Sequence, residues 1–172
     1  MSLAIIVFIF LVLFGSVYWL KPSPRDKRLA DLRFSAIKHG LIVKQHTFTP
    51  DSKKTGVRDA ITGTTYTLFS QDPKAEPTLL MRIMGQAGWD TDSLPEGYSW
   101  HDGHSQLAGT DALAQIGFAE AVANIPDHLH MVEIYGNRAS IMPAEMKGVS
   151  AEQYIALLEF LMDHRDVFRK AA

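Results

Sequence analysis

The sequence contains no cysteine, and this absence excludes several classes of protein at once. Without thiols the chain cannot form a disulfide framework, a zinc–thiolate centre or a cysteine nucleophile. It also lacks a phosphate-binding glycine–lysine loop, a Gly-x-Ser-x-Gly motif, internal repeats and low-complexity tracts. A hydrophobic fraction of 47% beside a charged fraction of 21% is too apolar for a largely disordered chain. We therefore expect a folded domain.

Charge is missing from the start of the chain. From Leu3 to Leu20 no residue is charged, and only Gly15 and Ser16 interrupt the apolar run. A helix of this length is about 27 Å long, which matches the hydrocarbon core of a bilayer. The alternatives are a cleaved signal peptide and a buried core helix, but the basic n-region and small-residue cleavage site of a signal peptide are lacking. The pattern predicts a transmembrane anchor over residues 1–20.

Positive charge follows the apolar run directly. Lys21, Arg25, Lys27, Arg28 and Arg33 come after it, and no Lys or Arg precedes it. The positive-inside rule then predicts a periplasmic N-terminus and a cytoplasmic C-terminal domain. Basic side chains next to a bilayer are attracted to anionic lipid, so we expect these five to face the lipid. Residues 21–39 are thus predicted to form a basic juxtamembrane helix.

Residues 40–172 have the length of one globular domain. Helical periodicity is present over 25–39, 110–124 and 150–169, and strand patterns are present over 41–48, 64–70, 78–84, 129–135 and 138–142. Gly136-Asn137 is typical of a hairpin turn, whereas 85–109 has the composition of a long loop. We predict an α+β domain with a mainly antiparallel sheet and about three helices.

The net charge of −2 hides a division along the chain. Residues 21–58 hold ten Lys and Arg against three Asp and Glu, a net +7, whereas 59–172 hold seven against sixteen, a net −9. The division is either an orientation signal beside ordinary solvated acids or an acidic surface for a basic partner. The candidate partner surface lies in the long loop and comprises Trp89, Asp90, Asp92, Glu96, Tyr98 and Trp100. In the alternative interpretation its aromatic residues cap the core beneath the loop.

The sharpest chemical cluster is His101-Asp102-Gly103-His104. Imidazole and carboxylate groups at this spacing are donors that Zn²⁺, Mn²⁺ or Ni²⁺ accept, and His128 with His130 could complete such a set. The alternative is a group of ordinary solvated histidines, because a loop spacing of this kind fixes no geometry. A metal-dependent enzyme using His101, Asp102 and His104 is therefore an alternative function.

Two segments resemble a known family. Trp19 to Arg28 is W-L-K-P-S-P-R-D-K-R, leading into a helix–Gly–strand segment, and Leu94 to Trp100 is L-P-E-G-Y-S-W. The chain resembles a family of uncharacterised proteobacterial single-pass inner-membrane proteins, some of which are labelled preprotein translocase accessory subunits. The resemblance covers the first 45 residues well and the remainder in patches. Tyr98 stands where the family pattern has tryptophan, and the basic Lys53-Lys54 loop departs from that pattern.

The resemblance implies a bacterial inner-membrane protein and carries no catalytic residues. We therefore expect a non-enzymatic accessory or interaction protein anchored in the membrane. Its expected partners are membrane lipids and a membrane or cytoplasmic protein. Nucleic acid is not an expected partner, because the one basic cluster lies beside the lipid headgroups. No cofactor is expected.

Overall fold

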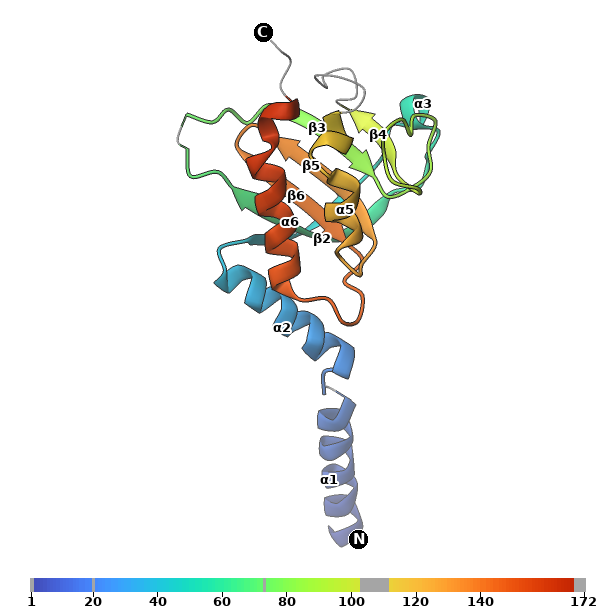
Figure 1. Ribbon diagram of the computed structural model, residues 1–172. Helices are drawn as coiled ribbons and strands as arrows, with labels where there is room; N and C mark the ends of the chain where they lie inside the picture. Colours follow the sequence, from blue (N-terminus) through green and yellow to red (C-terminus); the bar gives the residue numbers. More distant parts are fainter. Residues whose placement is uncertain (1, 20, 73, 103–111, 169–172) are drawn as a thin grey trace. The chain divides into compact units, whose positions relative to one another are not determined.

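The computed structural model describes residues 2–19, 21–72, 74–102 and 112–168 (Figure 1). It divides into two compact units, Met1–Asp31 and Leu32–Ala172. The first unit contains helix α1 (Ser2–Trp19) and the beginning of helix α2 (Pro24–Lys38). The Ser23 hydroxyl accepts the Asp26 backbone N–H at 3.1 Å and donates to the Asp26 carboxylate at 2.8 Å. This reciprocal cap satisfies backbone donors at the start of α2, where a helix was predicted.

Helix α1 is apolar on all sides, and its side chains from Leu3 to Gly15 are exposed. Within the described residues, no helix has the length and apolar composition that crossing a membrane requires. The transmembrane anchor over residues 1–20 therefore stays a prediction.

The second unit is built on one sheet of six antiparallel strands in the order β1-β2-β6-β5-β3-β4. The strands are β1 (Ile42–Phe48), β2 (Ile61–Phe69), β3 (Leu79–Met84), β4 (Ser99–Asp102), β5 (Leu129–Tyr135) and β6 (Arg138–Pro143). Tyr135 pairs with Arg138 across Gly136-Asn137, so the predicted hairpin is confirmed. The α+β class with an antiparallel sheet is confirmed as well.

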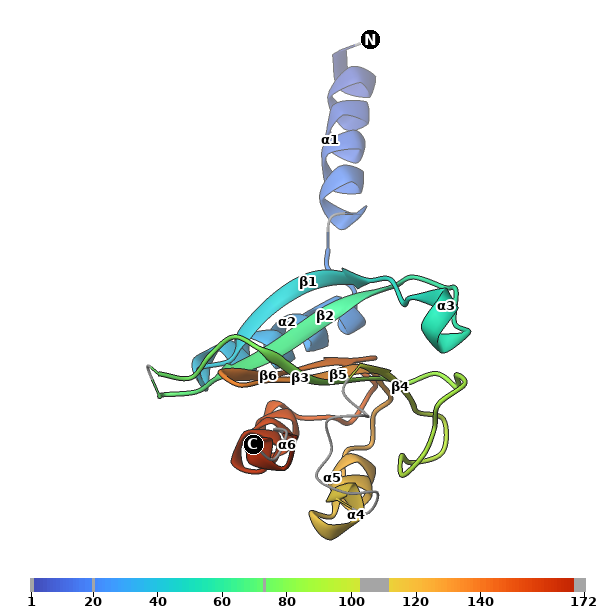
Figure 2. The same cartoon turned by 90° about the horizontal axis from the view of Figure 1, so that it is seen from above.

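Helices α5 (Phe118–Ala123) and α6 (Ala151–Asp163) lie on the same face of the sheet (Figure 2). Ser150 is the N-cap of helix α6 and forms a capping box with Gln153. The side chains that α6 turns toward the sheet are fully or almost fully buried, and they include Tyr154, Leu157, Leu158 and Leu161. The helix ends at Asp163, before the predicted 169, and is followed by a short 3₁₀ turn (Arg165–Phe168).

Alternation along the strands gives the sheet two different faces. Met81 and Ile83 of β3 are fully buried in the main core, together with their neighbours on β5. Arg82, which lies between them, points to the opposite face, because successive strand side chains alternate. That second face carries a smaller apolar cluster of Phe48, Met84, Met131 and Met142. Its polar positions form the candidate site described below.

Two local predictions were wrong, and one short helix was not predicted. The helix predicted over 110–124 is divided into α4 (Ala112–Gln115) and α5, because Gly117 adopts a left-handed φ of 71° between them. Residues 110 and 111 lie outside the described residues. Strand β4 occupies part of the predicted long loop, and the one-turn helix α3 (Ser52–Thr55) was not predicted. Both are four residues long, too short to show a period.

Candidate functional site

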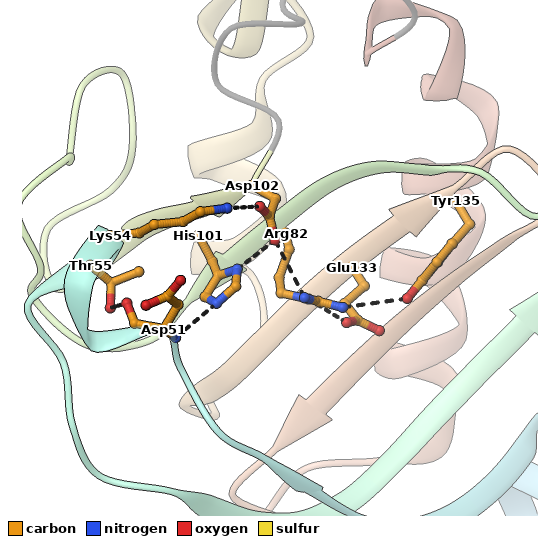
Figure 3. Close-up of polar contacts among 8 residues, drawn as sticks. All are labelled: Asp51, Lys54, Thr55, Arg82, His101, Asp102, Glu133 and Tyr135. Atoms are coloured by element: carbon orange, nitrogen blue, oxygen red, sulfur yellow. Dashed lines mark hydrogen bonds and ion pairs between the residues drawn. The ribbon is translucent and has the colours of Figure 1, made fainter.

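A polar network lies where β3, β4 and β5 meet α3 (Figure 3). We define it by the side chains of Lys54, Arg82, His101, Asp102 and Glu133. Strand pairing brings them together, because Arg82 is opposite Asp102 on β4 and opposite Glu133 on β5. Lys54 reaches Asp102 from α3, with 3.4 Å between the amine nitrogen and the carboxylate. Residues far apart in the sequence thus share one face of the sheet.

Helix α3 is capped at both of its ends. The Asp51 carboxylate accepts the Lys53 backbone N–H at 3.0 Å and so caps the helix. Gly56 ends the helix with a φ of 78°, in the left-handed region that glycine adopts most easily. The Thr55 hydroxyl donates to the Asp51 carbonyl at 2.9 Å and is buried. These local bonds hold the Asp51 backbone N–H toward His101.

His101 uses both of its ring nitrogens inside the fold. Its Nε2 accepts the Asp51 N–H at 3.1 Å, which requires the ring proton to sit on Nδ1. Nδ1 is 2.5 Å from the Asp102 carboxylate and donates to it. The ring packs edge-on against Phe48 with 5.2 Å between centroids, and only 9% of the side chain is exposed. His101 therefore ties α3 to β4, with both ring nitrogens hydrogen-bonded within the chain.

The charges of the polar network balance. Arg82 donates from Nε to Glu133 at 2.6 Å and lies 3.4 Å from Asp102. Burial alone would raise the pKa of Asp102, but the hydrogen bond from His101 and the charge of Lys54 outweigh it, so this pKa is lowered. Two cations thus face two carboxylates across three strands. Each charged side chain of the network thus has an oppositely charged partner within it.

The same face continues along β5 and β6 as a cation–aromatic stack. The guanidinium carbon of Arg138 is 3.8 Å from the centroid of the Tyr135 ring and 6.0 Å from that of Phe69. The Tyr135 hydroxyl also accepts from Arg82 at 3.5 Å, which joins the stack to the polar network. Charged and aromatic side chains of neighbouring strands are therefore linked along this face.

The predicted metal ligands are not assembled within the described residues. There, no group of three or more His, Asp or Glu side chains is placed to hold one metal ion. His104 lies outside the described residues. His128 bonds through Nε2 to the Gly85 carbonyl at 2.9 Å and packs edge-on against His130. Burial lowers the pKa of His130 from its ordinary value, and the neighbouring His128 lowers it further.

The candidate partner surface divides into a buried and an exposed part. Tyr98 is 8% and Trp100 4% exposed, so these two rings cap the core beneath the loop, as the alternative interpretation predicted. Trp100 also donates its indole N–H to the Asp92 carbonyl at 2.9 Å. Trp89 is 72% exposed, and Asp92 and Glu96 are exposed, while Asp90 is half-buried. The exposed residues of the predicted surface are therefore Trp89, Asp92 and Glu96.

Trp89 is held in place although its ring is exposed. Its backbone N–H donates to the Thr55 carbonyl at 3.1 Å. A Cβ atom added to Gly56 would lie 2.5 Å from the indole nitrogen, so the ring lies directly on the glycine backbone. Only glycine at position 56 leaves room for the indole ring so close to the backbone. Sequence patterns alone do not reveal this contact.

The predicted lipid-facing cations also fall into two groups. Lys21, Arg25 and Lys27 are exposed and Arg28 is half-buried, all in the first unit. Arg33 belongs to the second unit, where it donates from Nε to the Glu145 carboxylate at 2.8 Å. Its guanidinium is therefore committed to the domain, in contrast to the predicted lipid-facing role.

Glu145 was not predicted as a key residue, because a single acid in a loop has no distinguishing pattern. It is 9% exposed and accepts the Tyr66 hydroxyl at 2.6 Å as well as the Arg33 guanidinium. Next to it, the Tyr154 hydroxyl donates to Asp127 at 2.5 Å, and the rings of Tyr66 and Tyr154 pack at 4.9 Å. Burial and the neighbouring carboxylates raise the pKa of both tyrosines, so each stays a protonated donor.

The described geometry thus offers a self-contained polar network, a rigidly held exposed tryptophan, and an exposed apolar helix. The first two belong to the domain and the third to the first unit. Comparison of the chain with protein-family models, with curated proteins and with solved structures found no match, so neither a family nor a function follows from similarity.

Proposed function

We propose that the protein is a non-enzymatic, membrane-anchored interaction protein, in which α1 is embedded in lipid and the α+β domain contacts a protein partner. One observation carries this proposal. Eleven large apolar side chains between Leu3 and Phe14 each have an exposed fraction of 50% to 78%. A helix that is apolar on all sides is stable in apolar surroundings and not in water.

The energetics of insertion support lipid as these surroundings. Thirteen of the first twenty residues are Leu, Ile, Val or Phe. Each favours insertion by roughly 0.3 to 0.6 kcal/mol, so together they favour it by about 4 to 8 kcal/mol. Lys21, Arg25 and Lys27 follow α1 and are exposed, and the positive-inside rule keeps such residues in the cytoplasm. The proposed location is the bacterial inner membrane, with the N-terminus periplasmic and the domain cytoplasmic.

A fluorescent protein fused after Ala172 tests anchoring and orientation together. The fusion should be bright and confined to the cell membrane, because a cytoplasmic C-terminus lets the reporter fold. Leu11→Arg should reduce the insertion free energy by about 2.5 to 3.5 kcal/mol and move fluorescence toward the cytosol. Leu11→Val, which keeps the apolar surface, should stay at the membrane. A dark wild-type fusion with an active phosphatase at the same position would reverse the orientation, and membrane retention of Leu11→Arg would contradict the anchor.

We propose that the partner contacts the surface formed by Trp89, Asp92 and Glu96. Tryptophan is one of the side chains in which the energetically dominant positions of protein interfaces are enriched. The two exposed carboxylates give the surface a negative charge that is complementary to a basic partner. A role in binding and not in catalysis is supported by His101, whose nitrogens are both bonded within the fold.

Trp89→Ala should remove most of the crosslinks that the full chain forms with its partner in cells. The ring is 72% exposed, so its loss should change the free energy of unfolding by less than about 1 kcal/mol. Met146→Ala removes an exposed apolar side chain from a different loop and serves as the matched control. Chemical crosslinking followed by mass spectrometry provides the measurement. If Trp89→Ala and Met146→Ala keep the same crosslinks as the wild type, the partner binds elsewhere.

A further inference from the structure

Helix α2 has two apolar faces, and the domain covers only one of them. Leu32 and Ala36, one helical turn apart, are 7% and 0% exposed and belong to the main core. Phe34 and Ile37 are also one turn apart, but they are 67% and 54% exposed. With 3.6 residues per turn, Phe34 points about 200° away from Leu32. Two large apolar side chains of α2 are therefore presented on the side away from the core.

Large apolar side chains followed by a lysine favour a lipid surface as the partner of this face. Lys38 is exposed and lies one turn after Phe34, whereas the exposed Asp31 lies one turn before it, nearer the start of α2. A helix with bulky apolar groups flanked by lysine is typical of segments that lie in a membrane interface, where the lysine reaches lipid phosphate and the apolar groups enter the acyl boundary. Arg33, the residue before Phe34, is paired with Glu145 of the domain.

Chain length keeps α2 near any membrane that holds α1. Four residues, 20–23, separate the end of α1 from the start of α2. Even fully extended, a connection of this length spans only about 14 Å. A bilayer that contains α1 is consequently within reach of the first turn of α2.

We propose that α2 lies in the membrane interface, with Phe34 and Ile37 inserted at the acyl boundary and Lys38 at the level of the lipid phosphates. The proposal rests on the proposed anchoring by α1. It gives α2 a double role, since Leu32 and Ala36 bind the domain while Phe34 and Ile37 bind lipid.

Single-cysteine probes test this proposal directly, because the natural chain has no cysteine that would compete for a label. Leu11→Cys, Phe34→Cys, Ile37→Cys and Glu159→Cys are each made in the full chain and labelled with an environment-sensitive fluorophore. The proteins are reconstituted into vesicles of equal parts phosphatidylglycerol and phosphatidylcholine, with and without nitroxide-bearing lipid. Glu159 is exposed on α6 and serves as the control for a position away from α2.

Probes at positions 34 and 37 should emit at shorter wavelength than the probe at 159 and lose intensity when nitroxide lipid is present. The probe at 11 should also be quenched, which reports anchoring by α1 independently. Quenching at 11 without quenching at 34 and 37 would overturn the interfacial role of α2 and leave the anchor intact. Absence of quenching at 11 would instead overturn the proposed function. A probe at 34 that is shielded from a water-soluble quencher but insensitive to nitroxide lipid would assign this face to a second protein chain and overturn the proposal.

Discussion

Glu145→Gln should lower the free energy of unfolding by about 2 to 4 kcal/mol. The carboxylate is 9% exposed and accepts hydrogen bonds from Arg33 at 2.8 Å and from Tyr66 at 2.6 Å. Removing one partner of a buried ion pair typically costs about 3 to 5 kcal/mol, because the other charge is left without compensation. The Arg33 side chain is 37% exposed, so water recovers part of this loss. Glutamine has the same size and the same unbranched side chain as glutamate. The substitution therefore adds no new steric cost at the left-handed φ of 57° that position 145 adopts.

Urea unfolding of the full chain in detergent micelles, followed by tryptophan fluorescence, measures this loss. Glu159→Gln makes the same chemical change at an exposed position on α6 and should stay within about 0.5 kcal/mol of the wild type. The double variant Arg33→Met/Glu145→Gln should be more stable than the sum of the two single changes predicts, because it removes both members of the pair. Additive effects, or a Glu145→Gln loss no larger than the Glu159→Gln loss, would show that the pair does not stabilise the domain.

Leu158→Ala should destabilise the domain by about 2 to 5 kcal/mol, because Leu158 is fully buried between α6 and the sheet. Truncation removes three methyl or methine groups from a close-packed core and leaves a cavity that the neighbouring side chains can fill only in part. Tyr154 and Leu161 lie on the same face of the helix and are also fully buried. The loss should therefore be near the upper part of this range if these neighbours cannot move.

The same urea titration gives the value, and Glu159→Ala is the matched control. It places alanine at the adjacent, exposed position, so it reports the small change in helix propensity alone. A loss below about 0.5 kcal/mol for Leu158→Ala would mean that this face of α6 is not packed against the sheet.

Several elements were determined by local sequence. Ser150 with Gln153 marked the start of α6, and its apolar stripe identified the residues that the structure buries. Gly136-Asn137 marked the turn between β5 and β6. In each case the signal lies within a few residues, because capping, helical period and turn chemistry depend on near neighbours. The uncharged run at the start of the chain is likewise visible in α1, whose apolar side chains are exposed.

The candidate site depended on contacts that no local pattern contains. Glu145 pairs with Arg33 across 112 positions, and His101 bonds to the Asp51 backbone across 50. Tyr98 and Trp100 fall in the same predicted loop as Trp89, yet they are buried and Trp89 is exposed.

The difference between these two groups has a physical reason. Charge and apolar composition along the chain determine which segments are stable in water and which are stable in apolar surroundings. This composition can be read from the sequence alone. Which acid neutralises which cation, and which aromatic ring covers the core, depends on strand order and register, since these bring distant residues within a few ångströms. Only the tertiary structure decided that Arg33 binds Glu145 within the domain while Phe34, the next residue, faces outward.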